Sequence, residues 1–475
     1  MFTFAKKSLW QVPHTAEPPI PQQEPVDEEL CPGYNSASFY PANPGEVLAE
    51  RFQLLVKIGW GSQSTVWLAR DISRYLPALK WQSERTVVLK IINSNNADDA
   101  RHEKEIESHI MQQNPEHRGR VILRTCLDDV EVTGPEGRHM CLVYEPMREP
   151  IWILQRRFVE RKIPLPIAKA YIYFLLAGLD YLHSECKVVH SDLKLGNILM
   201  SFENENILTN FINRKQQMQY KIDGKSGRTI YRCHNDFGAL DGRDIKNMVP
   251  KISDFGLATR LDKPDTRDGM VGKQLGIYPI QPDYYRAPEV ILGCGWDFKA
   301  DIWNFGVLVR YPATTYFPVG YNRWFGLTVN NPFDKLWNIL GSQELFQQVY
   351  DADGKYHAKS HLAEMIALLG PPPKALLAKS KTMSEHNWPQ AVANDTGKLC
   401  NNSQEFFDGP FFDAEGEFRH NGLIPSRSLE NTTPFLEQED REAFLSFVRQ
   451  MLNWLPEERK TARELMDHQF LKLGG

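Results

Sequence analysis

Residues 189–197 read Val-His-Ser-Asp-Leu-Lys-Leu-Gly-Asn, an apolar run that leads into a turn carrying an aspartate, a lysine and an asparagine. Phosphoryl transfer from ATP needs a carboxylate that orients the attacking hydroxyl, and Asp192 is the expected group. Lys194 is expected to neutralise charge on the transferred phosphoryl group. Alone, this stretch could also be an ordinary solvated loop, so the rest of the chain has to decide.

A second motif, Ser-Asp-Phe-Gly at residues 253–256, supplies another aspartate. Asn197 and Asp254 carry oxygen ligands of the kind that magnesium takes beside nucleotide phosphates. Because four polar positions occur in the required order between apolar strands, the solvated-loop interpretation becomes weak. The two motifs together predict phosphoryl transfer that depends on ATP and Mg²⁺.

Upstream, Lys90 ends the run from Thr86 to Leu89, a pattern typical of a buried strand. A lysine there can bind the α and β phosphates if a carboxylate holds it in place. We predict Glu105, on the charged helix that follows, as this partner. Glu103 and Glu107 are expected on other faces of the helix and are second choices. By itself Lys90 would be a solvated strand end, but the downstream motifs favour the catalytic role.

A glycine-rich turn precedes Lys90 and opens a predicted strand pair. Glycines without a Cβ atom let backbone N–H groups approach phosphate oxygens. A lone Gly-x-Gly is more often a simple hairpin turn, so its place ahead of the lysine is what favours nucleotide binding. The nucleotide-binding residues expected in this turn are Ile58, Gly59, Gly61, Ser64 and Val66, with Ser64 where a third glycine is usual.

The segment that joins the β-rich and helical parts of the chain is the expected adenine site. Glu145 and Met147 are expected to offer backbone groups to the base, and Tyr144 to close the deeper part of the pocket. These contacts do not depend on side-chain chemistry, so only the position in the chain supports them.

Two further polar contacts are expected in the helical part of the chain. Glu289, in Tyr-Arg-Ala-Pro-Glu, is predicted to pair with Arg459, although both could be surface charges of little energetic value. Asp301 begins a predicted central helix and is expected to cap backbone N–H groups of the catalytic loop, a role compatible with a plain helix N-cap.

The distribution of apolar residues predicts an α+β fold with two lobes. Residues 1–45 hold eight prolines and few periodic apolar residues, which favours a disordered or loosely draped tail. Residues 46–147 alternate β-rich runs with one charged helix, from about 98 to 111, and predict a small antiparallel lobe. Residues 148–475 predict a larger, mainly helical lobe that begins with an amphipathic helix near 167–182.

Two segments of the second lobe look inserted. A polar, glycine-rich spacer at about 200–250 separates the two catalytic motifs and is predicted to be a surface excursion. The stretch at about 310–341 contains Pro312, Pro318 and Pro332, where the helix begun near position 301 should continue. Because proline in a helix interior costs about 3 kcal/mol, we predict a shortened helix.

Composition excludes several classes of protein. Hydrophobic content of 42% and charged content of 24% are typical of a soluble globular chain, and the net charge of -5 gives no reason to expect a nucleic-acid or membrane partner. The seven cysteines include no Cys-x-x-Cys pair, which favours a reducing compartment over disulfides or a zinc site. No transmembrane helix is expected, since no run of about 18 apolar residues occurs. The expected location is the cytoplasm.

The chain from about 52 to 473 resembles eukaryotic protein kinases, and within them it is most similar to the fungal-type serine/arginine-rich-protein kinases (SRPK family). The residues that carry this similarity are Ile58-Gly59-Trp60-Gly61, Ser64-Thr65-Val66-Trp67-Leu68, Gly178-Leu179-Asp180-Tyr181-Leu182-His183 and a His-x-Asp motif without arginine. The resemblance implies a two-lobe kinase fold and use of ATP and Mg²⁺, and we expect a monomer. It also implies a serine acceptor in proteins rich in arginine and serine, such as splicing factors, and entry into the nucleus as well as a place in the cytoplasm.

Several positions depart from the kinase pattern. Ser191 replaces the arginine that normally binds a phosphate on the activation loop, so we predict activity that does not depend on phosphorylation there. Gln63 replaces the usual aromatic residue at the tip of the glycine-rich turn. Ser360 and Ala367 match acidic positions of the family's substrate-docking groove, and because neither is charged, processive handling of Arg-Ser repeats is in doubt. A pseudokinase that serves as a binding module, and a kinase of a neighbouring family without Arg-Ser preference, remain alternatives.

Overall fold

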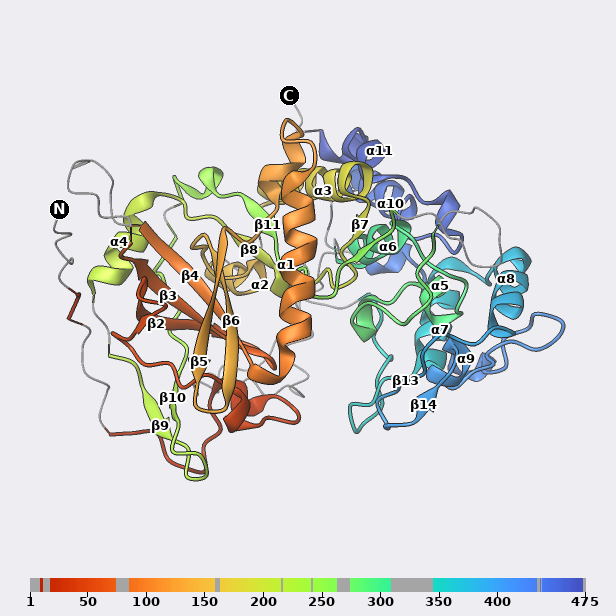
Figure 1. Ribbon diagram of the computed structural model, residues 1–475. Helices are drawn as coiled ribbons and strands as arrows, with labels where there is room; N and C mark the ends of the chain where they lie inside the picture. The colour runs from red at the N-terminus through yellow and green to blue at the C-terminus, as the bar shows by residue number, and fades with distance from the viewer. Residues whose placement is uncertain are drawn as a thin grey trace.

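A β-sheet lobe and a helical lobe lie side by side in the computed structural model (Figure 1). The structure describes residues 9–11, 18–73, 85–158, 163–214, 217–240, 242–262, 274–308, 345–433, 436 and 438–472. The predicted α+β class and its two-lobe arrangement are confirmed. The atypical stretch at 310–341 lies outside the described residues.

The small lobe is built on a six-stranded antiparallel sheet in the order β1-β2-β3-β4-β6-β5. Its strands are β1 (Val47–Leu48), β2 (Phe52–Trp60), β3 (Ser64–Asp71), β4 (Arg85–Ile92), β5 (Asp128–Gly134) and β6 (Gly137–Tyr144). Val66 lies opposite Gly59 on one side and opposite Lys90 on the other. The register therefore brings the glycine-rich turn and the lysine to the same part of the sheet.

Helix α1 (Ala97–Gln112) connects the two lobes. Its buried positions recur at helical spacing and are Ala100, Glu103, Ile106, Glu107 and Ile110. Two of these are glutamates, an unusual choice for a buried face. Ile106 and Ile110 belong to the main hydrophobic core of the large lobe, while Ala100 packs with small-lobe residues. The helix thus presents both glutamates at the junction between the lobes.

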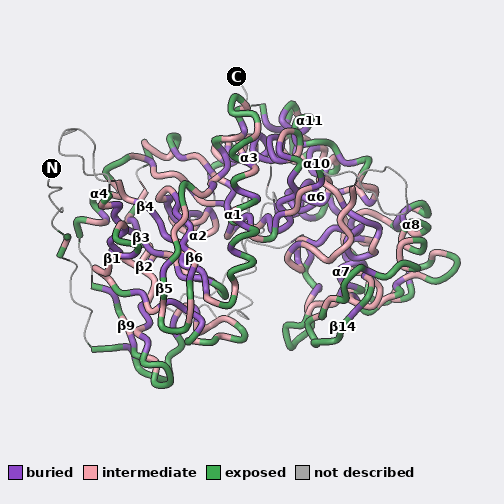
Figure 2. The backbone as a smooth tube through the Cα atoms, viewed as in Figure 1, coloured by how far each residue is buried: buried purple, intermediate pink, exposed green. Residues whose placement is uncertain are grey.

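The large lobe is organised around the buried helix α3 (Leu165–Tyr181), which Figure 2 shows largely in the buried class. By length and composition alone, residues 165–186 could cross a membrane, but 61% of the most apolar window is buried inside the fold. Its apolar surface is therefore satisfied by packing. The other helices are α2 (Ile151–Leu154), α5 (Pro288–Ile291), α6 (Lys299–Leu308), α7 (Ala358–Leu369), α8 (Lys374–Ser384), α9 (Ser403–Phe406), α10 (Gln438–Arg449) and α11 (Ala462–Met466).

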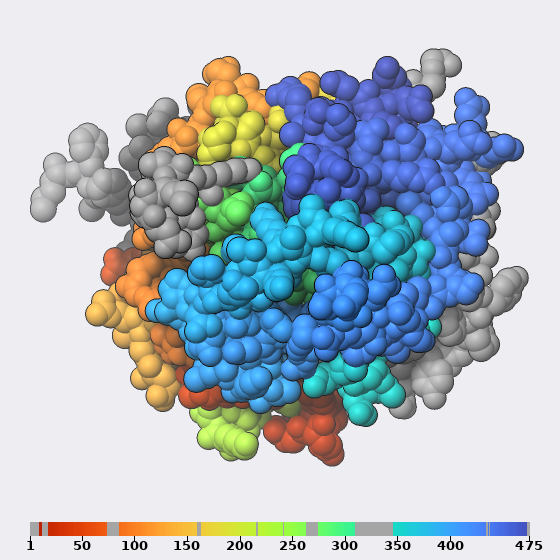
Figure 3. All heavy atoms as spheres, turned by 90° about the vertical axis from the view of Figure 1, so that its right-hand side faces the viewer, coloured from red at the N-terminus to blue at the C-terminus, as the bar shows by residue number. Residues whose placement is uncertain are grey.

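Short strand pairs place the catalytic motifs in the large lobe. β7 (Val188–Val189) pairs with β12 (Thr259–Arg260), and β8 (Ile198–Met200) pairs with β11 (Pro250–Ile252). A further short pair, β13 (Val392–Ala393) with β14 (Leu399–Cys400), lies near α9. Residues after 345 cover the end of the large lobe that faces away from the sheet (Figure 3).

Residues 18–45, part of the tail predicted to be disordered or loosely draped, lie against the spacer. Ile20 is 7% exposed and Val26 is 1% exposed, and both pack against Ile230 of the spacer. The backbone N–H of Ile20 donates to the carbonyl of Tyr220 at 2.7 Å. Although proline-rich, the segment contains enough apolar and acidic side chains to attach to a surface that the spacer provides.

The spacer, predicted to be a surface excursion, packs against the small lobe. It contains α4 (Glu205–Asn213) and a hairpin of β9 (Tyr220–Ile222) and β10 (Thr229–Tyr231), which lie beside the small-lobe sheet in Figure 1. Phe211 and Phe237 pack with the sheet residues Leu68 and Val88. The core of the small lobe therefore includes residues from outside the predicted range 46–147.

A buried ion cluster joins the tail, the sheet and the spacer. Lys57 on β2 is 1% exposed, and its Nζ contacts Glu28 and lies 3.0 Å from Asp27. The other carboxylate oxygen of Glu28 accepts from Arg228 at 2.6 Å. Burial alone would raise the pKa of Glu28, but Lys57 and Arg228 lower it below its usual value. The cluster is a fully internal set of charges that depends on all three segments.

Candidate active site

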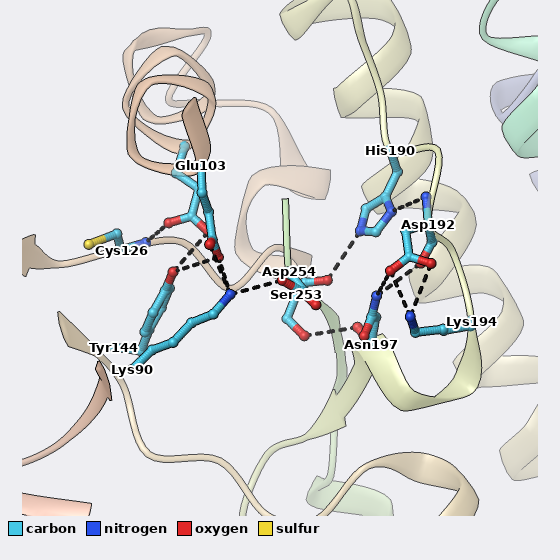
Figure 4. Close-up of polar contacts among 11 residues, drawn as sticks. Lys90, Glu103, Cys126, Tyr144, His190, Asp192, Lys194, Asn197, Ser253 and Asp254 are labelled. Carbon is cyan, nitrogen blue, oxygen red and sulfur yellow. Dashed lines mark hydrogen bonds and ion pairs between the residues drawn. The ribbon is translucent and has the colours of Figure 1, made fainter. Parts of the chain in front are cut away.

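Lys90 lies at the centre of the small-lobe half of the site (Figure 4). Its Nζ is 2.7 Å and 2.8 Å from the two carboxylate oxygens of Glu103 and 3.0 Å from Oδ1 of Asp254. Burial lowers the pKa of Lys90, but the carboxylates of Asp254 and Glu103 outweigh it and raise the pKa above its usual value. The lysine is therefore a permanent cation facing the junction of the lobes.

The predicted partner of Lys90, Glu105, is wrong, and Glu103 takes its place. Glu105 is exposed on the outer face of α1, next to Arg101 and Arg260. The reason is the helical period, because position 103 lies three residues from both Ala100 and Ile106 on the buried face. That apolar spacing was the signal in the sequence that could have identified the correct glutamate.

Glu107 is a second inward-facing glutamate whose position the sequence did not suggest. It is 1% exposed, and its Oε2 accepts from the backbone N–H of Cys126 at 2.6 Å. The hydroxyl of Tyr144 lies 3.1 Å from Oε1 of Glu103 and 3.3 Å from Oε1 of Glu107. Tyr144 therefore lies behind Lys90, between the two glutamates.

On the large-lobe side, the structure brings Asp192, Lys194 and Asn197 together, as predicted (Figure 4). The ammonium of Lys194 is 3.1 Å and 2.8 Å from the two oxygens of Asp192. The amide nitrogen of Asn197 donates at 2.9 Å to both the carbonyl and Oδ2 of Asp192. Both side-chain oxygens of the aspartate are thus held in one orientation.

Asn197 and Asp254 have the chemistry expected of magnesium ligands. Ser253 donates from its N–H and its hydroxyl to the carbonyl of Asn197, both at 2.9 Å, which holds the two motifs side by side. The amide nitrogen of Asn197 is used by Asp192, so its amide oxygen remains for a cation. Lys90 lowers the pKa of Asp254, which keeps this carboxylate ionised. One amide and one carboxylate oxygen, completed by phosphates and water, suit Mg²⁺.

Asp301 holds the catalytic loop from below, which confirms its predicted capping role. Its carboxylate accepts from the backbone N–H groups of His190 at 2.8 Å and Ser191 at 3.0 Å. The N–H of Asp192 lies 3.3 Å from Nδ1 of His190, so Nδ1 accepts and the proton resides on Nε2, which donates to the carbonyl of Ser253 at 3.1 Å.

Ser191 connects the catalytic loop to the segment after Asp254. Its φ of 61° lies in the left-handed region, and its hydroxyl donates to the carbonyl of Leu257 at 2.5 Å. An arginine at this position would instead extend towards a phosphate. The serine provides a direct link between the two loops that needs no phosphate.

The predicted pair of Glu289 and Arg459 is confirmed. Both side chains are fully buried, and two guanidinium nitrogens lie 2.6 Å from the two carboxylate oxygens. This bidentate geometry excludes the surface-charge interpretation.

Gly59 in the glycine-rich turn packs closely against the neighbouring strand. A Cβ on Gly59 would lie 3.3 Å from Cβ of Val66 on the neighbouring strand. The N–H of Gly61 donates to the carbonyl of Ser64 at 2.9 Å and closes the turn. Gln63, at the tip, donates to Asp99 of α1 at 3.1 Å. Ile58 and Val66 pack at the edge of a small-lobe apolar cluster.

In the expected adenine-binding segment, the backbone groups of Glu145 and Met147 differ in whether they are already hydrogen-bonded. The carbonyl of Glu145 already accepts from Nε and Nη2 of Arg124, at 3.2 Å and 3.0 Å, while the Glu145 carboxylate pairs with Lys251. Met147 is 5% exposed, and among the described residues its backbone N–H has no hydrogen-bond partner. Met147 is thus the better placed of the two for a base.

Comparison with known proteins agrees with this geometry. The model of the protein kinase domain family matches residues 52–223 and 240–471. The chain belongs to the protein kinase family. The kinase is 31% identical over 471 residues to a serine/threonine protein kinase of Aspergillus fumigatus, covering 97% of this chain and 96% of that protein.

Two further relatives place the kinase near the SRPK family, as the resemblance implied. It is 26% identical to the serine/threonine-protein kinase SRPK of Physarum polycephalum, covering 94% of this chain and 91% of that protein. It is 24% identical to the protein kinase dsk1 of Schizosaccharomyces pombe, covering 78% and 87%. A crystal structure of a kinase domain superposes with a TM-score of 0.56 at 19% identity, covering 92% of this chain and 100% of the other, and shows the fold alone.

These relatives place the chain among the serine/threonine protein kinases. The unmatched residues between 223 and 240 fall inside the spacer and include β10, the second strand of its hairpin.

Proposed function

We propose that this kinase transfers the γ-phosphoryl group of ATP, with Mg²⁺, to a serine hydroxyl of a protein, and that it favours serine beside arginine. The observation that carries this proposal is the contact between the two halves of the site. Lys90, held by Glu103, reaches Asp254, which lies beside the set formed by Asp192 and Asn197.

On the nucleotide side, Lys90 would bind the α and β phosphates, and the backbone of the glycine-rich turn would cover them. The free N–H of Met147 would donate to the adenine ring. Asn197 and Asp254 would hold magnesium, which neutralises charge on the phosphates during transfer. Because these groups are already oriented by their own hydrogen bonds, little reorganisation is needed when ATP binds.

On the acceptor side, Asp192 would orient the serine hydroxyl and accept its proton. Lys194 contacts Asp192 but its side chain is 42% exposed, so it can turn towards the transferred phosphoryl group and neutralise its charge. Ser191 would keep the loop in place without an activation-loop phosphate. Activity independent of such phosphorylation is therefore part of the proposal.

The proposed preference for serine beside arginine rests on the similarity to the SRPK relatives. One departure from that family concerns how long a substrate stays bound. Ser360 and Ala367, half-buried on α7, are uncharged at the positions that match the family's acidic groove. Without those carboxylates, we expect an arginine-containing peptide to dissociate after each transfer. Phosphorylation of Arg-Ser repeats would then be distributive.

The test measures phosphate incorporation from Mg-ATP into an Arg-Ser repeat peptide, a matched Lys-Ser peptide and a neutral serine peptide, for the wild type and Asp254→Ala. We expect transfer that is strongest on the Arg-Ser peptide and lost in the variant. Equal transfer to all three peptides would refute the substrate preference and leave the kinase activity intact.

A thermal shift with Mg-ATP separates a folded, inactive protein from an unfolded one. A ligand at 100 times its Kd stabilises the folded state by about 2.7 kcal/mol. A folded wild type with neither transfer nor a shift would refute the proposed activity.

A further inference from the structure

Three oxygen atoms form a buried chain behind Lys90. Oε1 of Glu107 is 3.3 Å from the hydroxyl oxygen of Tyr144, which is 3.1 Å from Oε1 of Glu103. Glu107 is 1% exposed, Tyr144 3% and Glu103 4%. Water therefore has little access to these three oxygen atoms. The protons between them have to come from the three side chains themselves.

Counting protons points to an extra proton on one of the two carboxyl groups. The Tyr144 hydroxyl has a single hydrogen, yet its oxygen faces two carboxyl groups at hydrogen-bond distance. Burial raises the pKa of Tyr144 well above its usual value, as do Glu107 and Glu103, so the phenol is not the ionised member. If both glutamates were ionised, one oxygen–oxygen contact would join two acceptors without a hydrogen.

Geometry identifies Glu107 as the group that holds the extra proton. Glu103 accepts from the ammonium of Lys90 on both of its oxygens, which favours its ionised form. Glu107 receives only the backbone N–H of Cys126, on Oε2, so Oε1 is free to carry a hydrogen towards Tyr144. No described ammonium or guanidinium lies within ion-pair distance of Glu107.

The charges around Glu107 agree with this assignment. Burial raises the pKa of Glu107, and the negative charge of Glu103 adds to it, to about 8. The Cys126 N–H, Lys90 and Arg124 act in the opposite direction and do not cancel the increase. Arg124 lies over the Tyr144 ring at 4.5 Å and donates to the carbonyl of Glu145, and the Cys126 thiol has a raised pKa and is neutral.

We propose that Glu107 is a neutral carboxylic acid near neutral pH and a positioning residue for the reaction. It donates to the Tyr144 hydroxyl, which then donates to Glu103 and orients the carboxylate that holds Lys90. The part played by Lys90 rests on the proposed function. Ionisation of Glu107 at alkaline pH would remove the donor and place a second negative charge beside Glu103, so the hold on Lys90 would change.

The test compares the pH profile of kcat/KM for the wild type and Glu107→Gln. The glutamine amide donates and accepts in the same places and cannot ionise. We expect Glu107→Gln to match the wild type within about twofold near neutral pH, and to lack the alkaline loss that the wild type shows with a midpoint of about 8. Glu105→Gln, on the exposed face, is the matched control and should keep that loss.

Glu107→Met tests the hydrogen bond itself. It should lower kcat/KM about fivefold, an effect that Glu107→Gln avoids, because a buried hydrogen bond of about 1 kcal/mol is lost and Tyr144 has one donor fewer around it. An alkaline loss in Glu107→Gln that equals the wild type's would overturn the proposal, as would a Glu107→Gln variant as impaired as Glu107→Met.

Two readouts do not depend on kinase activity. The infrared difference spectrum between wild type and Glu107→Gln should contain the carbonyl band of a protonated carboxyl near neutral pH, and the band should vanish at alkaline pH. The melting temperature of Glu107→Gln should exceed that of the wild type by a margin that grows with pH. The margin should grow from pH 4.5, the pKa of Glu107 in the unfolded chain, to about pH 8, its pKa in the folded protein, and should then stay constant.

The sign of the stability effect follows from linkage. Glu107 has a higher pKa in the folded protein than in the unfolded chain. Its contribution to stability is therefore fully present below the unfolded pKa and is lost as the pH rises through the folded pKa. Absence of the protonated-carboxyl band would overturn the proposal whatever the activity. A band in a protein that transfers no phosphate would instead uphold the protonation and refute the proposed function.

Discussion

Two lysines of the same sheet, Lys57 on β2 and Lys90 on β4, each bind a glutamate from outside the sheet, yet their surroundings differ. The Lys57 side chain is 1% exposed and its partner Glu28 is 0% exposed. The Lys90 side chain is 21% exposed, and its second partner, Asp254, is 44% exposed. The first lysine is sealed among three chain segments, while the second faces the junction of the lobes.

On the proposed function, this difference separates a structural charge, Lys57, from a functional one, Lys90. A sealed ion has no water to replace a lost partner, so its partners have to be permanent. A partly open ion can exchange a carboxylate for a phosphate at modest cost, since solvent and ligand can both reach it. Stability should therefore depend on Lys57 and activity on Lys90.

The largest effect is expected from Lys90→Met. Loss of a preorganised cation at a site of developing charge lowers the rate by about 10²–10³-fold, or 2.7–4 kcal/mol. The melting temperature should change little, because Asp254 faces water and Glu103 can take up a proton. Steady-state kinetics and a thermal melt on the same preparation check this. A variant that melts far lower but keeps its turnover would reverse the comparison.

The next effect is expected from Lys57→Met. Removing one member of a buried ion cluster typically lowers the free energy of unfolding by about 3–5 kcal/mol, and the value here belongs at the lower end because Arg228 still pairs with Glu28. Denaturant unfolding measures it, and kcat at low temperature should stay near the wild-type value.

Neutral replacement of the whole cluster sharpens this prediction. In the quadruple variant Asp27→Asn, Glu28→Met, Lys57→Met, Arg228→Met, no charge of the cluster is left without a partner, so most of the lost stability should return. If the quadruple variant is less stable than Lys57→Met, the cluster contributes net stability beyond satisfying its own charges.

A smaller effect separates the two candidate partners of Lys90. Glu103→Gln keeps the shape but removes the negative charge, and kcat/KM should fall about tenfold, or 1.4 kcal/mol. Glu105 lies on the exposed face of the same helix, so Glu105→Gln should change kcat/KM less than about twofold. The reverse ranking would restore the original sequence interpretation and contradict the observed pairing.

The glutamate assignment shows how far sequence alone could go. Asp192, Lys194 and Asn197 lie within six consecutive positions, so their proximity follows from the chain itself. The partner of Lys90 comes from a separate helix, and its identity depends on which face of α1 packs inward. The positions of Ala100, Ile106 and Ile110 contain that information, but three glutamates at alternate positions obscured it.

The small lobe shows where local patterns fail. The β2, β3 and β4 runs were predictable from their apolar and β-branched residues. The tail and the spacer were not, since each is too polar to form a core alone and packs against the other and against the sheet. Glu28, Lys57 and Arg228 are up to 200 residues apart in sequence. No local window reveals that such charges will meet.

The smallest effect is expected from Ser191→Ala, which removes the link to Leu257. A single hydrogen bond of this kind contributes about 0.5–1.5 kcal/mol, so the melting temperature should fall slightly and kcat by a few-fold at most. Phosphatase treatment should leave the kcat of the wild type unchanged, because the serine makes its contact without a phosphate. If phosphatase abolished wild-type activity, another cation would have to bind an activation-loop phosphate. The exchange of a carboxylate for a phosphate that we expect at Lys90 would then extend to this loop as well.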